Sequence, residues 1–338
     1  MFQIIFIIVI SLIVTYCCKK FSFLLNYTGS DHQKFTNKQV TPLVGGVSIL
    51  LFILISLPGD LLYLKIFCFF IFFIGFFSDI KKINSPKLRL ILQLIIILLL
   101  IYLLNISKIK TNIILLDYLI SNYYIFGILF TTFCFLIIIN GTNFIDGVNT
   151  LAVGYYLSLL FILTTIDHKS SYLSEVLIDN YFFLILIYIF ILNFFNKIFL
   201  GDSGAYLIGT IFSYLLVDIH INNLFISPYY FVLLLWYPGF ENLFSIIRKY
   251  RFKKSPINPD INHFHQLLFF YFNYNNFFNK KYVSTITGMF INAYNFLLFL
   301  LASQNLQSSK FQILLIIVSV ILYIVIYLKL LNFKKNCK

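Results

Sequence analysis

Long apolar runs recur along the whole chain, and they constrain the fold more than any other feature of the sequence. Most are about 17 to 25 residues long, which is the length a helix needs to cross a bilayer. Because lipid offers no hydrogen-bonding partners, a spanning segment must satisfy its own backbone polar groups, and a helix does so. We therefore predict an all-α, polytopic integral membrane protein, with residues 1–338 forming a single transmembrane domain.

The composition agrees with a lipid environment, because 60% of the residues are hydrophobic and only 11% are charged. A soluble domain has about a quarter charged residues. The first apolar run, 1–18, is followed by Lys19 and Lys20 and not by a small-residue cleavage site. We expect it to be the first transmembrane helix and not a cleaved signal peptide.

The apolar runs predict about eleven transmembrane helices. Their approximate ranges are 2–18, 42–58, 62–78, 88–105, 123–139, 150–166, 181–196, 203–219, 224–240, 286–303 and 311–331.

The basic residues predict the orientation of these helices. With the N-terminus outside and strict alternation, the inner loops hold 20 of the 25 Lys and Arg residues. Cytoplasmic loops carry such an excess, so the C-terminus and the long polar segment 241–285, a cytoplasmic loop, are expected inside. The net charge of +13 is then mostly a signal of topology. We expect no nucleic-acid partner, because the basic residues flank apolar spans without a groove-reading motif.

Three carboxylates, Asp79, Asp146 and Asp202, fall at the inner ends of predicted spans, each beside glycine or small polar residues. A carboxylate at the edge of an apolar span is costly and is usually paired or functional. Any one of them could be a helix N-cap. Three on one membrane face, each in a distinctive pattern, favour a functional site.

Four polar motifs surround this set of carboxylates. They are Gly75–Asp79 followed by Lys87 and Arg89, then Asn140–Asn149, then Leu200–Ala205, and finally Ser255–Asp260 leading to His263 and His265. Oxygen ligands of Asp and Asn suit Mg²⁺, and Lys and Arg suit phosphate oxygens. Two histidines are too few for a zinc site, so we expect them to contact phosphate or sugar. The residues predict a Mg²⁺–phosphate site at the cytoplasmic face.

In their order along about 31–265, these motifs and Pro42–Gly46 resemble the polyprenyl-phosphate N-acetylhexosamine-1-phosphate transferases, the family of WecA and MraY. Eleven spans with an outer N-terminus resemble the WecA-type branch. The resemblance implies transfer of an N-acetylhexosamine-1-phosphate from a UDP-sugar to undecaprenyl phosphate, with release of UMP. Such a reaction initiates a lipid-linked cell-surface glycan, as in lipopolysaccharide O-antigen biosynthesis. Mg²⁺ is the implied cofactor, with Mn²⁺ as an alternative.

The resemblance also implies roles for particular residues. Asn143 and Asp202 match the metal ligands, and Asp79 and Asp146 match catalytic carboxylates. The implied substrate contacts are Asn149 with uracil, Lys38, Lys87 and Arg89 with phosphate, and His263 and His265 with diphosphate and sugar.

Three positions depart from the family pattern. Ser78 stands where the family has the first Asp of a pair, Thr150 where it often has Gly, and Gln266 at the end of its His-x-His-His pattern. Because Ser78 has no carboxylate, it argues against any mechanism in which the first Asp is the essential base or nucleophile.

The resemblance places the protein in the bacterial inner membrane as a multi-pass protein with a cytoplasmic active site. Membrane lipid surrounds it, and a homodimer is a candidate assembly. The identity of the amino sugar stays open. A membrane transporter or lipid flippase is the alternative function, because many spans with polar residues fit that class too. Against it, the two halves show no internal repeat, and the polar residues gather at one membrane face.

Overall fold

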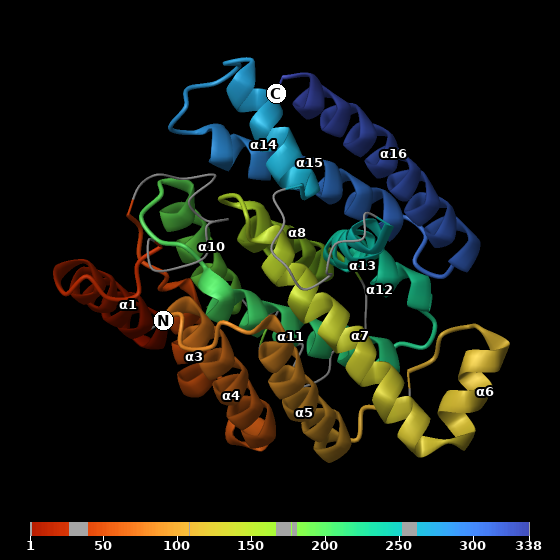
Figure 1. The fold of residues 1–338 in the computed structure, drawn as a ribbon. Coiled ribbons are helices and arrows are strands. Elements are labelled where there is room, and N and C mark those ends of the chain that lie inside the picture. Colours follow the sequence, from red (N-terminus) through yellow and green to blue (C-terminus); the bar gives the residue numbers. More distant parts are fainter. Residues whose placement is uncertain are drawn as a thin grey trace.

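The computed structural model describes residues 2–26, 40–107, 109–166, 177, 181–251 and 262–337. Within these ranges the chain is built of helices and contains no β-strand (Figure 1). Leu25 and Pro42 form an isolated β-bridge. The predicted all-α class is therefore confirmed for the described part of the chain.

Among the described residues, seven helical segments are long and apolar enough to cross a membrane. They are α1 (Phe2–Lys20), α4 (Leu62–Asp79, preceded by the 3₁₀ turn Gly59–Leu61), α5 (Pro86–Leu104), α7 (Tyr124–Ile145), α11 (Gly201–Asn222), α15 (Val283–Ser303) and α16 (Ser309–Asn336).

The remaining helices are shorter. They are α3 (Gly45–Ser56), α6 (Ile114–Asn122), α8 (Leu151–Thr165), α10 (Tyr181–Phe194), α12 (Pro228–Leu234), α13 (Trp236–Arg251) and α14 (Phe264–Tyr274). The apolar helices α3, α8 and α10 have 12, 15 and 14 residues. At about 1.5 Å per residue they are shorter than the roughly 30 Å hydrocarbon core. The described chain thus supports seven spans, or eight if α12 and α13 form one, and eleven stays a prediction.

Helices α12 and α13 correspond to the predicted span 224–240, but they meet at an angle of 72°. Pro238 explains the break, because it has no N–H to donate to the carbonyl of Leu234 four residues earlier. The hydroxyl of Tyr155 donates to that carbonyl instead, at 2.8 Å. Beyond the bend, α13 and α14 occupy much of the segment 241–285, so this predicted loop is largely helical where it is described.

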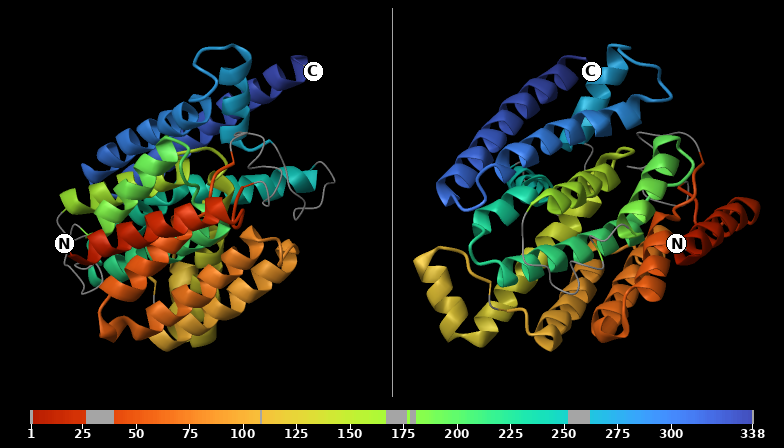
Figure 2. Two further views of the ribbon diagram at one scale, coloured as in Figure 1. Left: turned by 90° about the vertical axis from the view of Figure 1, so that its left-hand side faces the viewer. Right: turned by 180° about the vertical axis from the view of Figure 1, so that it is seen from behind.

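Helix α11 lies at the centre of the molecule, with α3–α5 on one side and α14–α16 on the other (Figures 1 and 2). It packs against α3, α4 and α7. Gly75 allows the closest approach, because a Cβ there would lie 2.3 Å from the Cα of Ser203. At the next contact, a Cβ on Gly209 would lie 2.8 Å from the Cα of Ile139. The backbone of α11 is therefore held directly against α4 and α7.

This packing brings together the helix ends that carry the polar motifs. The C-terminal ends of α4 and α7 meet the N-terminal ends of α5 and α11, as the contacts of Asp79, Arg89 and Asp146 with α11 show. The N-terminal end of α15 joins them through Ser284, which contacts Asn149. All of these ends were predicted on one membrane face. Which side of the membrane that face occupies stays a prediction.

Candidate active site

Asp202 lies at the start of α11 and is paired with Arg89 of α5. One guanidinium nitrogen of Arg89, Nη1, lies 2.7 Å from Asp202 Oδ2 and 2.6 Å from the hydroxyl of Ser78. The Ser78 hydroxyl in turn donates to the same Asp202 oxygen at 2.5 Å. Because Asp202 and Arg89 are each about one-fifth exposed, at 19% and 20%, this charge pair is accessible at the end of the bundle.

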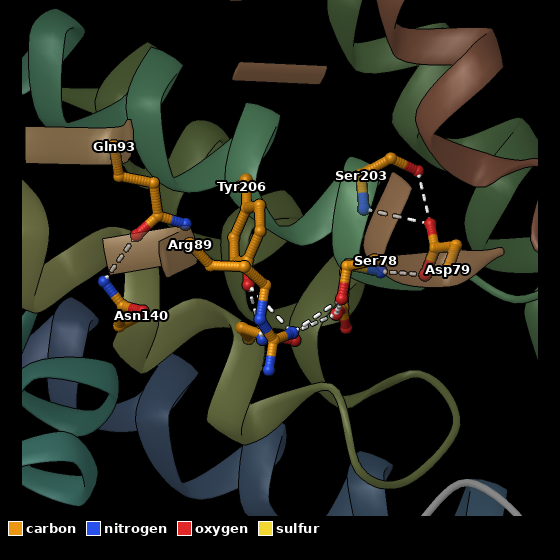
Figure 3. Close-up of polar contacts among 9 residues, drawn as sticks. Ser78, Asp79, Arg89, Gln93, Asn140, Ser203 and Tyr206 are labelled. Carbon is orange, nitrogen blue, oxygen red and sulfur yellow. Dashed lines mark hydrogen bonds and ion pairs between the residues drawn. The ribbon is translucent and has the colours of Figure 1, made fainter. Parts of the chain in front are cut away.

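Asp79 is buried and uses both carboxylate oxygens to bind the first turn of α11 (Figure 3). Oδ1 accepts the backbone N–H of Asp202 at 2.8 Å, and Oδ2 accepts the N–H of Ser203 at 3.2 Å and its hydroxyl at 2.8 Å. The first N–H groups of a helix have no partner within the helix. Asp79 therefore caps α11 from the neighbouring helix α4 and sets the position of Asp202.

Gly201 makes this cap possible. Its φ angle is +76°, and a Cβ would lie 2.8 Å from an oxygen of Asp79. Asp146 accepts the backbone N–H of Gly201. Loss of hydration, together with the nearby charges of Asp202 and Asp79, raises the pKa of Asp146 well above its usual range. Carboxylates this close repel one another when they are ionised.

Asn143 lies near the same cluster, because its amide donates to the hydroxyl of Tyr206 at 3.3 Å. That hydroxyl is also 3.4 Å from Arg89. Neither Oδ1 of Asn143 nor Oδ1 of Asp202 accepts a hydrogen bond from the described residues, which leaves one amide and one carboxylate oxygen open. Mg²⁺ uses one or two such protein ligands and completes its shell with water and phosphate oxygens. The two residues therefore fit the predicted metal.

A second motif, the histidine pair, lies against the chain that follows Asn143. The ring of His263 is 5.2 Å from that of Phe144, and it stacks on His265 at 5.7 Å. The ring of His265 is so close to Gly147 that a Cβ there would lie 2.1 Å from Nε2. The structure thus brings the predicted histidines beside the segment that carries Asn143 and Asp146.

Asn149 is buried, and its amide donates to Asn196, a residue that the sequence did not single out. Thr150 follows with φ +66°, a conformation that glycine adopts at no steric cost. Three side chains hold the strained turn: Asn193 accepts the Thr150 N–H at 2.5 Å, Asn292 donates to its carbonyl at 2.8 Å, and Ser284 accepts the N–H of Asn149 at 3.0 Å.

Of the two predicted lysines, Lys87 is described by the structure, and it does not join this cluster. Lys87 is exposed in the first turn of α5. It is two residues from Arg89, and residues at that spacing do not share a helix face. Lys38 and the motif 255–260 lie outside the described residues.

Sequence reasoning missed Tyr206, Glu241 and Tyr323. Tyr206 lies one helical turn after Asp202, so the i, i+4 spacing was available to find it. Glu241 is one of only two glutamates in the chain, and this scarcity was its signal. Tyr323 had none, because it is one of 24 tyrosines and lies in an apolar helix.

The fold and the site define a multi-pass helical membrane protein with carboxylates, an arginine and histidines gathered where its helix ends meet. Residues 61–220 match the model of glycosyl transferase family 4. This is the family of MraY- and WecA-like polyprenyl-phosphate hexosamine-1-phosphate transferases. No curated protein matches the sequence. The match includes the cluster from Ser78 to Tyr206 and supports the function of a membrane glycosyl-phosphate transferase. It does not specify a branch of the family.

Proposed function

We propose that this protein transfers an N-acetylhexosamine-1-phosphate from a UDP-sugar to undecaprenyl phosphate and releases UMP, as a WecA-type enzyme of the bacterial inner membrane. The observation that carries the proposal is the Asp202–Arg89 pair beside Asn143, where open oxygen ligands and a phosphate-binding cation meet. The family match over 61–220 supports the same reaction class.

Asp202 and Asn143 would hold Mg²⁺, or Mn²⁺ in its place, through their open oxygens. The bound ion would act as a Lewis acid on the nucleotide diphosphate and lower the cost of the charge that develops on departing UMP. Arg89 is placed to bind a phosphate oxygen with the donors that Asp202 and Ser78 do not use. Asp79 keeps Asp202 in position by capping α11, and Asp146 supports the same turn through Gly201.

The reaction needs little proton transfer. An oxygen of the lipid phosphate forms a bond to the β-phosphorus of the UDP-sugar, and the bond from that phosphorus to the oxygen of UMP breaks. The attacking oxygen is already an anion at neutral pH. Positioning and neutralisation of charge therefore carry most of the rate, which agrees with a site where each carboxylate binds a helix end or a cation.

The remaining assignments belong to the same proposal. Asn149 would contact uracil, and His263 and His265 would contact the diphosphate and sugar. Lys38 and Lys87 would meet phosphate at the rim. The active site would face the cytoplasm, and the protein would form a homodimer.

The proposal is tested by UMP release from a set of UDP-N-acetylhexosamines, with purified protein, Mg²⁺ and undecaprenyl phosphate. Asp202→Asn and Asn143→Ala should each lower turnover about a hundredfold or more, because both charge compensation and orientation are lost. Asp218→Asn is the matched control, since it makes the same change near the opposite end of α11.

Near-normal turnover in Asp202→Asn would overturn the metal assignment. If the wild-type protein releases no UMP but moves a UDP-sugar or a lipid across vesicle membranes unchanged, the transporter or flippase function replaces the transferase.

A further inference from the structure

Glu241 of α13 is completely buried. Both of its carboxylate oxygens are hydrogen-bonded, to three partners in all. Oε1 lies 2.9 Å from Nδ1 of His263 and accepts the backbone N–H of Phe264 at 3.3 Å. Oε2 accepts the hydroxyl of Tyr323 at 2.6 Å. A buried carboxylate is expensive unless each oxygen is hydrogen-bonded. This one is satisfied only by joining α13, the start of α14 and α16.

The contact with Glu241 determines where His263 carries its proton. An ionised carboxylate only accepts hydrogen bonds, so Nδ1 must be the protonated nitrogen of the His263 ring. Nε2 is then the nitrogen available to a ligand, and it forms no hydrogen bond with the described residues. The nitrogen that faces a ligand is set by the hydrogen bond that the other nitrogen makes.

The His263 ring is also fixed in direction. Phe144 lies 5.2 Å from it, and His265 stacks on it at an interplanar angle of 14°. These contacts hold the ring beside the segment 143–147, which contains Asn143 and Asp146. The nitrogen bound to Glu241 points back into the protein, so the opposite edge of the ring faces away from α13.

We propose that Glu241 and Tyr323 are positioning residues: Tyr323 orients Glu241, and Glu241 holds His263 in the tautomer and direction that present Nε2 to the sugar diphosphate. This rests on the proposed function. All three residues lie outside the matched range 61–220, and Tyr323 links the C-terminal helix α16 to His263 through Glu241.

A purely structural role is the competing interpretation, because His263 also starts α14 and forms a capping box with Gln266. The two interpretations differ in how substitutions combine. Residues that act through one another give non-additive effects, whereas independent losses of stability and function add.

The first experiment measures kcat/KM for UMP release in His263→Ala, Glu241→Ala and the double variant. We expect each single variant to lose about ten- to a hundredfold, as displaced groups in active sites do. The double variant should be no slower than His263→Ala. Losses that multiply in the double variant, or near-normal activity of Glu241→Ala, would overturn the inference.

Tyr323→Phe keeps the volume of the side chain and provides a test if Glu241→Ala fails to accumulate. It should lower kcat/KM about two- to tenfold, as expected for one lost hydrogen bond, and it should have no effect in the His263→Ala background. Tyr294→Phe is the matched control, because its hydroxyl joins α15 to Ser319 of the same helix α16 without reaching Glu241. A loss in Tyr294→Phe equal to that in Tyr323→Phe would count against the inference.

A second measurement does not depend on turnover. The ¹⁵N NMR signals of His263, assigned by their loss in His263→Asn, should show a proton on Nδ1 in the wild-type protein and a mixture of tautomers in Glu241→Ala and Tyr323→Phe. An unchanged tautomer in both variants would refute the role of Glu241. If the wild-type protein releases no UMP, the proposed function fails instead, even where the NMR result is as expected.

Discussion

At the scale of single residues, Ser78 links two charged members of the cluster through an uncharged side chain. Its hydroxyl accepts from Arg89 and donates to Asp202 within 2.6 Å. A carboxylate at this position would lie against Asp202, and two charges that close raise the pKa of one of them. Serine avoids the repulsion and still links the arginine to the proposed metal ligand.

Ser78→Ala should therefore retain activity within about tenfold of wild type, since it removes one uncharged donor. Asp79→Asn should lose far more, because an amide offers only one oxygen where the carboxylate accepts three bonds from α11. UMP release from purified variants measures both. Equal losses in the two variants would show that capping of α11 is not what Asp79 contributes.

Ser78→Asp should be tolerated, because Arg89 lies close enough to compensate the added charge. The same assay measures it. If this substitution instead converts an inactive wild-type protein into an active one, the proposed activity is wrong for the natural chain.

At the scale of helices, glycine contacts bring the elements of the site together. Gly75 places the last turn of α4 on the first turn of α11, where Asp79 and Asp202 lie. An added Cβ would meet backbone atoms of Asp202 and Ser203 within 2.7 Å. Backbone cannot move aside as a flexible side chain can, so the two helices would have to separate.

Gly75→Ala should therefore destabilise the protein by about 1 to 3 kcal/mol, the usual cost of overpacking, and should lower activity by displacing Asp202. Thermal unfolding in detergent and UMP release measure the two effects. Gly59→Ala is the control, because a Cβ there has nothing within 4 Å. A Gly75→Ala protein as stable and active as Gly59→Ala would contradict the close contact.

At the scale of the whole molecule, the excess of Lys and Arg in the predicted inner loops predicts which side of the membrane the polar cluster faces. Lys280 is exposed and lies in the segment predicted to be cytoplasmic. Asp60 is also exposed and lies between α3 and α4, in a predicted outer loop. The described structure places the polar cluster at the other end of α4 from Asp60.

In a background with its five cysteines replaced, Lys280→Cys should react with a membrane-impermeant maleimide only after permeabilisation. Asp60→Cys should react in intact cells. The predicted outer loops contain few basic residues, which is typical of loops outside the cytoplasm. Labelling of Lys280→Cys from outside would invert the orientation and, with it, the cytoplasmic placement of the site.

The sequence alone determined the class of fold and several members of the polar cluster. Apolar runs of membrane length can only be helices, and charged residues are too scarce in them to be incidental. This was enough to predict that Asp79, Asp146 and Asp202 share one face, and the order of the polar motifs with the resemblance they carry added Asn143 and Arg89.

Only the tertiary structure decided how these residues face one another. The spanning helices are apolar on nearly every side, so no periodic stripe shows which side packs against protein and which against lipid. That Asp79 turns to the backbone of α11, that Pro238 bends a span, and that Tyr323 reaches Glu241 across 82 positions depend on helix packing. Contacts of this kind join residues far apart in the chain, and no local pattern records them.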